Sequence, residues 1–152
     1  MKRSIATLLL GVVFIAGSTF AQPPQKVIGA GLGAPFKAPY NQPAGTTRTL
    51  SRDTVYVLTG FYFVDSTATI NIPAGTVVFG DSATGATLII KRGGRMNATG
   101  TASQPIVFTS RKPAGSRQRG DWGGVVVLGN APTNKPTTTQ VEGIGAGGEY
   151  GG

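Results

Sequence analysis

ATINIPAGTVVF, residues 68–79, and ATLIIKRGGRMN, residues 86–97, align with each other without a gap. Identical residues stand at 68/86, 69/87, 72/90 and 75/93, and Ile70 is matched by Leu88. Each segment has the composition of a short strand, then a glycine turn, then a second short strand. Self-similarity at a spacing of about 20 residues is typical of solenoids and stacked arrays.

Short strands of the same kind are predicted on both sides of this repeat. They have β-branched or aromatic centres and are separated by glycine-containing turns. Their ranges are 54–58, 61–64, 105–109, 125–128 and 139–142. Two all-β architectures suit evenly spaced short strands, a parallel β-helix and a β-sandwich. The internal repeat and the scarcity of clear hairpin turns favour the β-helix, in which each strand pairs with its equivalent one coil away.

A β-helix also predicts which side chains point inward. Equivalent positions of successive coils lie about 4.8 Å apart, so inward apolar side chains stack into ladders. The expected members of these ladders are Ile70, Ile72, Val78, Leu88, Ile90, Met96, Ile106 and Phe108. Glycines are expected where the backbone turns with a positive φ.

The N-terminal segment, MKRSIATLLLGVVFIAGSTFAQ, has the three parts of a secretory signal peptide. Lys2 and Arg3 supply the positive start, residues 5–16 are apolar, and Ala21 ends a small-x-small cleavage site. The apolar run is short for a membrane span, and no cysteine follows it that could carry a lipid. We therefore expect residues 1–21 to be removed, and the mature protein to be exported and not transmembrane.

Two further segments complete the predicted organisation. Residues 22–47 contain five prolines and several glycines, which indicates an extended leader or linker and not a packed element. Residues 48–152 are predicted to form the coils of the β-helix.

Composition limits the chemistry that the chain can perform. The sequence has no cysteine and no histidine, which excludes disulfides, thiolate chemistry, zinc sites built from Cys and His, and His-based triads. The formal net charge is +8. The basic residues are scattered, with Lys91, Arg92 and Arg95 in one group and Arg111, Lys112, Arg117 and Arg119 in another. We expect these residues to be solvated loop charge, with a patch that attracts anionic polymers as the alternative. Neither group carries a nucleic-acid-binding motif or interleaved aromatic residues, so we expect no nucleic-acid partner.

Three longer runs resemble a known family. AGTVVFGD (74–81), TLIIKRGGRMNATGTASQPIVFTS (87–110) and PAGSRQRGDWGGVVVLGNAP (113–132), followed by GGEYGG, resemble the opening coils of secreted right-handed parallel β-helix proteins of Bacteroidetes-type bacteria. Many such proteins carry a C-terminal type IX secretion sorting domain. The resemblance implies a right-handed parallel β-helix. Family members are longer, so we expect this chain to correspond to their N-terminal coils only, with an open C-terminal end that a partner would cap.

GDWGG, residues 120–124, contains the single tryptophan of the chain and allows two interpretations. In the structural one, the glycines bend the chain, Asp121 binds backbone N–H groups in a turn, and Trp122 covers a ladder. In the functional one, Trp122 stacks on a sugar ring while Asp121, Arg117 and Arg119 make polar contacts. These four residues are the candidate binding site.

No catalytic constellation is visible in the sequence. The acidic residues are Asp53, Asp65, Asp81, Asp121, Glu142 and Glu149. Hydrolysis of glycosides usually needs two carboxylates at a matched spacing. Asp81 and Asp121 are 40 residues apart, about two coils, which permits them to share a face. Calcium-binding loop motifs are absent. We expect no catalytic residue, no cofactor and no metal site.

The expected function follows from these observations. The chain is predicted to be an exported, non-enzymatic β-helix protein that binds or scaffolds polysaccharide or other material at the cell surface or outside the cell. One alternative is the N-terminal fragment of a carbohydrate-active lyase or glycoside hydrolase whose catalytic coils lie further on. Another is a fragment with no function of its own.

Overall fold

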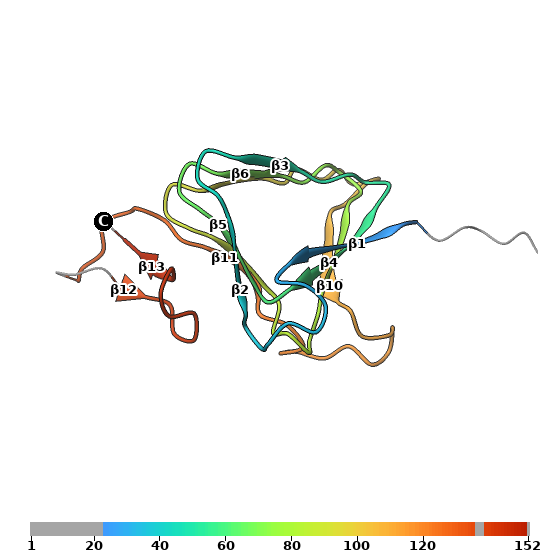
Figure 1. The fold of residues 1–152 in the computed structure, drawn as a ribbon. Coiled ribbons are helices and arrows are strands. Elements are labelled where there is room, and N and C mark those ends of the chain that lie inside the picture. The colour runs from blue at the N-terminus through green and yellow to red at the C-terminus, as the bar shows by residue number, and fades with distance from the viewer. Residues whose placement is uncertain (1–22, 136–138, 152) are drawn as a thin grey trace, which may run out of the picture.

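The computed structural model describes residues 23–135 and 139–151, so the predicted signal peptide, residues 1–21, lies outside the described residues. The described part is built of strands and turns and contains no helix. Three parallel sheets form the sides of a three-sided coil (Figure 1). The prediction of a parallel β-helix is therefore confirmed. The described strands make three full coils and part of a fourth.

Each sheet collects one strand from each of the three full coils, and sheets A and B also contain one strand of the fourth. Sheet A contains β1 (Gln25–Gly29), β4 (Val55–Thr59), β7 (Val77–Gly80) and β10 (Val107–Ser110). Sheet B contains β2 (Pro39–Gln42), β5 (Phe61–Val64), β8 (Thr87–Ile90) and β11 (Gly124–Val127). Sheet C contains β3 (Thr47–Thr49), β6 (Thr69–Asn71) and β9 (Arg95–Asn97). A separate antiparallel hairpin joins β12 (Thr139–Gln140) to β13 (Glu149–Tyr150).

The space between the sheets is filled by stacked apolar side chains, as predicted. Five predicted ladder members are buried, namely Ile70, Ile72, Val78, Leu88 and Ile90. The other three, Met96, Ile106 and Phe108, are partly buried and pack against the same cluster. Tyr62 and Leu58 are among its largest fully buried side chains. Burial of apolar area in these ladders is the main favourable contribution to folding.

The gapless alignment gave the wrong pairing. Thr69 does not pair with Thr87, because Thr69 of β6 pairs with Arg95 of β9 and Thr87 of β8 pairs with Phe61 of β5. The alignment offset therefore joined strands of two different sheets. Coils differ in length, so no single offset describes them. In sheet B, residues stacked on Pro39 follow at 61, 87 and 124.

The prediction that residues 22–47 form an unpacked leader was also wrong. β1 and β2 lie in this segment, pair with β4 and β5, and make up most of the first coil. The physical reason is that this coil closes the end of the apolar interior with polar side chains. Gln42 is buried and accepts a hydrogen bond from the Tyr62 hydroxyl at 3.1 Å, and Arg48 stacks above Ile70 and donates to the same hydroxyl. Ile28 and Leu50 of this coil are buried in the apolar cluster, but Gln42 and Arg48 interrupt the apolar pattern of its sequence.

One turn sequence recurs in the fold. Pro-Ala-Gly followed by Thr or Ser occurs at 43–46, 73–76 and 113–116. In each turn the backbone N–H of the last residue donates to the proline carbonyl, and the glycine has a positive φ. Pro at the start, a glycine with positive φ and a closing hydroxyl residue are suited to such turns.

Gly60 occupies the tightest corner between sheets A and B. It has a φ of +58° and connects β4 directly to β5. A Cβ atom at this position would lie 2.2 Å from the backbone oxygen of Ala38 in the neighbouring coil. Only glycine fits such a close approach of two chains.

The outer faces of the three sheets differ in chemistry. Sheet C presents mainly Thr and Asn side chains, including an amide ladder in which Asn97 donates to Asn71 at 2.8 Å. Sheet B presents Phe61, Phe63 and Ile89, which are buried because Val141, Ile144 and Tyr150 of the hairpin segment pack on them. Sheet A presents a row of valines and Phe79. No helix in the described ranges is long and apolar enough to cross a membrane.

Candidate functional site

GDWGG folds as its structural interpretation predicts. Gly120 and Gly124 have φ values of +86° and +81°, which bend the chain on both sides of Trp122. The indole ring packs against the interior cluster in the space that Gly80 leaves, because a Cβ on Gly80 would lie 2.4 Å from its Cδ2 atom. Gly80 is stacked on Leu58, so this space belongs to the interior of the coil. Trp122 is half-buried, and one part of its ring remains at the surface.

Asp121 is a buried carboxylate with strong hydrogen-bond donors around it. Lys112 Nζ lies 2.6 Å from Oδ1, and the backbone N–H of Gln118 donates to Oδ2 at 2.9 Å. The hydrogen bond from Lys112 is the largest influence, followed by that from Gln118, and together they lower the pKa of Asp121 from 3.8 to about 2. Asp121 is therefore ionised at neutral pH and holds the turn 118–121 in place.

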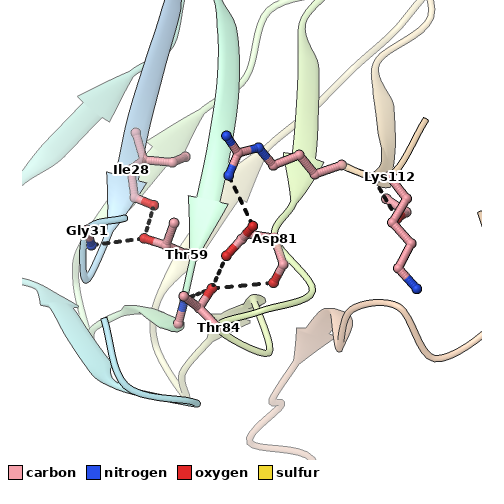
Figure 2. A network of polar contacts seen from close by, with 9 residues as sticks. Ile28, Gly31, Thr59, Asp81, Thr84 and Lys112 are labelled. Atoms are coloured by element: carbon pink, nitrogen blue, oxygen red, sulfur yellow. Dashed lines mark hydrogen bonds and ion pairs between the residues drawn. The ribbon is translucent and has the colours of Figure 1, made fainter. Parts of the chain in front are cut away.

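Asp81 lies at the same corner and is bound in a similar way (Figure 2). Its Oδ1 accepts from Arg111 Nη1 at 3.2 Å, and its Oδ2 accepts from the Thr84 hydroxyl at 3.0 Å. Thr84 in turn accepts from the backbone N–H of Gly60. The sequence suggested Asp81 and Asp121 as neighbours. Asp81 pairs with Arg111 and Asp121 pairs with Lys112, and these two cations are consecutive residues.

A groove of about 340 Å³ lies beside Asp121 and Trp122. The corner between sheets A and B forms one side, and residues 141–144 of the hairpin segment form the other. Its aromatic lining residues are Phe36, Phe61 and Trp122. Its charged lining residues are Lys37, Asp121 and Glu142. Phe36 is 66% exposed, so most of its ring is available to a ligand.

Lys37 lines this groove and is held in place by its neighbours. Its Nζ donates to the Gly143 carbonyl at 3.0 Å and lies 5.6 Å from the ring centre of Phe36 and 5.4 Å from that of Phe61. Its backbone φ is +60°, a conformation that side-chain-bearing residues seldom adopt. Such strained residues persist where the surrounding structure holds them, and they cluster at functional sites.

The four residues of the predicted binding site do not form one site. Trp122 and Asp121 line the groove, whereas Arg117 and Arg119 do not. Arg117 extends over Phe79, which lies on the outer face of sheet A, and Arg119 is exposed on the loop before Gly120.

Sequence reasoning missed most of the residues that line the groove. Phe36 and Lys37 lie in the segment that was assigned to a linker, and Phe61 was assigned only to a strand. Glu142 belongs to the hairpin segment that folds back on sheet B. An aromatic residue next to a lysine in a proline-rich segment, APFKAPY at 34–40, was the one signal available.

The ionised state of Asp121 leads to a prediction about pH. Because its pKa is lower in the folded protein, its ionised form stabilises the fold above about pH 4, and this contribution is lost as the pH falls towards about 2. We expect Asp121→Asn to lower the urea midpoint at neutral pH, and this difference from the wild type to shrink on acidification. Asp53→Asn, at an exposed carboxylate, is the control. A difference that stays constant from about pH 7 to 2 would contradict the prediction.

Comparison with known proteins agrees with this architecture. A family model described as a pectate-lyase-like beta helix domain matches residues 44–152. No curated protein and no solved structure matches the chain. The matched region covers sheet C and all but the first strands of sheets A and B. It includes most residues that line the groove, but Phe36 and Lys37 lie before its start. The chain therefore belongs to the family of pectate-lyase-like β-helix domains.

Proposed function

We propose that the chain is exported and binds polysaccharide at the cell surface or outside the cell without cleaving it. The observation that carries the proposal is the groove beside the hairpin, in which the exposed ring of Phe36 stands next to fixed polar groups. Ligand sites of this type combine apolar and aromatic walls with a few well-placed polar atoms. Membership in a pectate-lyase-like family supports a carbohydrate ligand, although a fold alone does not determine function.

The lining of the groove suits a sugar. The exposed ring of Phe36 offers flat apolar surface to the C–H face of a pyranose. The exposed side chains of Lys37 and Glu142 can exchange hydrogen bonds with sugar hydroxyls at the edges. Lys37 is already oriented by the Gly143 carbonyl, so little conformational entropy is lost when a ligand binds.

Binding without cleavage is supported by the state of Asp121. A glycosidase needs one protonated carboxyl group as general acid and a second carboxylate as base or nucleophile. Asp121 is ionised at neutral pH, paired with Lys112 and buried, so it cannot serve as the acid. In the described ranges, no three acidic side chains gather into a group that could hold a metal ion.

A carbohydrate-active enzyme is the second candidate, and one observation favours it. Two acidic residues, Asp121 and Glu142, line the same groove. Release of reducing ends from polysaccharide by the purified protein, abolished by Glu142→Gln, would establish this candidate and overturn binding without cleavage.

The binding proposal predicts the effect of removing the exposed ring. An array of polysaccharides that includes galactomannan, xyloglucan and polygalacturonate would identify a ligand, and calorimetry would give its dissociation constant. Phe36→Ala is expected to weaken binding about five- to tenfold, because an aromatic contact contributes about 0.5–1.5 kcal/mol beyond its buried area. The control is Leu32→Ala, at a residue that is 57% exposed and does not line the groove. Absence of any bound polysaccharide, or an equal affinity of Phe36→Ala and wild type, would contradict the proposal.

A further inference from the structure

Arg117 has an unusual set of partners for a charged side chain. Its Nε donates to the backbone carbonyl of Lys112 at 2.9 Å, and its Nη1 lies 3.4 Å from the hydroxyl of Thr109. Its guanidinium carbon lies 5.5 Å from the ring centre of Phe79. All three partners are neutral. At the corner between β10 and β11, Arg111 and Lys112 form ion pairs with Asp81 and Asp121. Among the described residues, Arg117 forms no ion pair.

These contacts fix the position of the Arg117 charge without neutralising it. A guanidinium that lies on an aromatic ring and is held by a carbonyl has lost much of its rotational freedom before any ligand arrives. Arg117 is nonetheless exposed, and its remaining N–H groups are free to meet a partner. A planar, preoriented guanidinium is suited to two parallel hydrogen bonds with a carboxylate or sulfate.

The surroundings of Arg117 strengthen its attraction for anions. The corner carries four cations, Arg111, Lys112, Arg117 and Arg119, and two carboxylates, Asp81 and Asp121, which leaves an excess of positive charge. The outer face of sheet A next to Arg117 is apolar, with Val77, Val107 and Phe79. A charge beside apolar surface is less screened by water than one in the middle of a polar surface.

We propose that Arg117 and the outer face of sheet A form a second binding site, which takes an oxyanion substituent of an acidic polysaccharide. A single fixed cation beside an apolar ridge fits a polymer whose charges are separated by uncharged sugar rings. It fits a nucleic acid poorly, because the dense phosphates of that polymer call for several cations along one track. The site is distinct from the groove, since Arg117 does not line it, and does not depend on the function proposed for the groove.

Three polymers with the same backbone test this site. Dextran carries no charge, dextran sulfate carries sulfate groups, and carboxymethyl dextran carries carboxylates. We expect the wild-type protein to bind at least one charged polymer and to bind unsubstituted dextran at least tenfold more weakly. If only the binding of dextran sulfate depends on Arg117, the site takes a sulfate group. If only the binding of carboxymethyl dextran depends on Arg117, the site takes a carboxylate. The same dependence with both shows a site for either oxyanion.

Arg117→Gln is expected to weaken binding of the charged polymer about tenfold or more, because a hydrogen bond to a charged group contributes about 1.5–3 kcal/mol. Arg95→Gln is the matched control, since it removes the same charge from an exposed position on sheet C. It should change the affinity less than about twofold if the site is local. Phe79→Leu keeps the charge and the apolar surface but removes the ring beneath Arg117, and it should give an intermediate loss. Far-ultraviolet circular dichroism would verify that each variant is folded.

Three results would overturn the proposal. The first is equal affinity of Arg117→Gln and wild type for both charged polymers. The second is an equal loss in Arg95→Gln, which would show a general effect of net charge. The third is equally tight binding of double-stranded DNA, which would show attraction of any polyanion. Phe36→Ala should leave this binding unchanged, so a failure of the groove and a failure of this site are distinguishable.

Discussion

Leu58→Ala is expected to lower the free energy of unfolding by about 3 kcal/mol, within the range of about 2–5 kcal/mol observed for such truncations. The side chain of Leu58 is 0% exposed and is stacked between Ile28 and the Gly80 position that Trp122 fills. These neighbours belong to three different coils, so the remaining cavity cannot close without displacing a coil. Since a domain of this size is stable by about 5–15 kcal/mol, the loss would be a large part of the total.

Urea unfolding followed by the fluorescence of Trp122, the single tryptophan, would measure this loss. Leu32→Ala deletes the same atoms from a side chain that is 57% exposed, and its effect should stay within about 0.5 kcal/mol. Similar losses in the two variants would show that Leu58 is not part of a packed interior.

Gly60→Ala is the second substitution with a large expected effect, a loss of about 3 kcal/mol. The new Cβ would lie 2.2 Å from the backbone oxygen of Ala38, so the neighbouring coil must shift. Overpacking of this kind costs about 1–3 kcal/mol. The positive φ of +58° adds a further penalty of about 1–2 kcal/mol for any residue with a Cβ.

Gly45→Ala separates these two costs. Gly45 has a comparable φ of +73°, and a Cβ there would meet no atom within 4 Å. Its loss should be limited to the backbone penalty, about 1–2 kcal/mol. Thermal unfolding of both variants measures the difference, and equal losses would mean that the contact between Gly60 and Ala38 places no constraint on the coils.

The sequence predicted the fold class and the interior well, for a physical reason. Strands such as 61–64 are short, apolar and bounded by glycines, so local composition marks them directly. Inward side chains such as Ile70 and Leu88 were recognised because burial requires apolar residues at those positions. Both features depend on local composition and on burial in a packed interior, and both are therefore visible as a pattern of apolar residues in the sequence.

The pairing of strands and the first coil could not be predicted in the same way. Pairing depends on the lengths of the connecting loops, and these vary between coils, so the alignment of 68–79 with 86–97 joined the wrong strands. Among the described residues, the strands of the first coil pair on one side only, and its polar residues Gln42 and Arg48 resemble those of a linker. Its strands became recognisable only through the partners that they find in the second coil.

The candidate site was predicted in part. Trp122 and Asp121 were singled out because they are unusual residues between glycines, and both line the groove. Arg117 is close to them in sequence but reaches the other side of the corner, over Phe79. Phe36 and Lys37 come from a distant part of the chain, so only the folded structure brings them to the groove.

The unequal coil lengths have a consequence for how such proteins diversify. In sheet B the interval between stacked positions grows from Pro39–Phe61 to Thr87–Gly124, yet the strands remain in register. Additional residues are accommodated in the corner loops, which supply Asp121, Trp122 and Arg117. Selection can therefore exchange corner loops one at a time on an unchanged framework, in the way that antibodies vary their loops on a constant sandwich. The same property makes this chain a scaffold for grafting loops of chosen specificity.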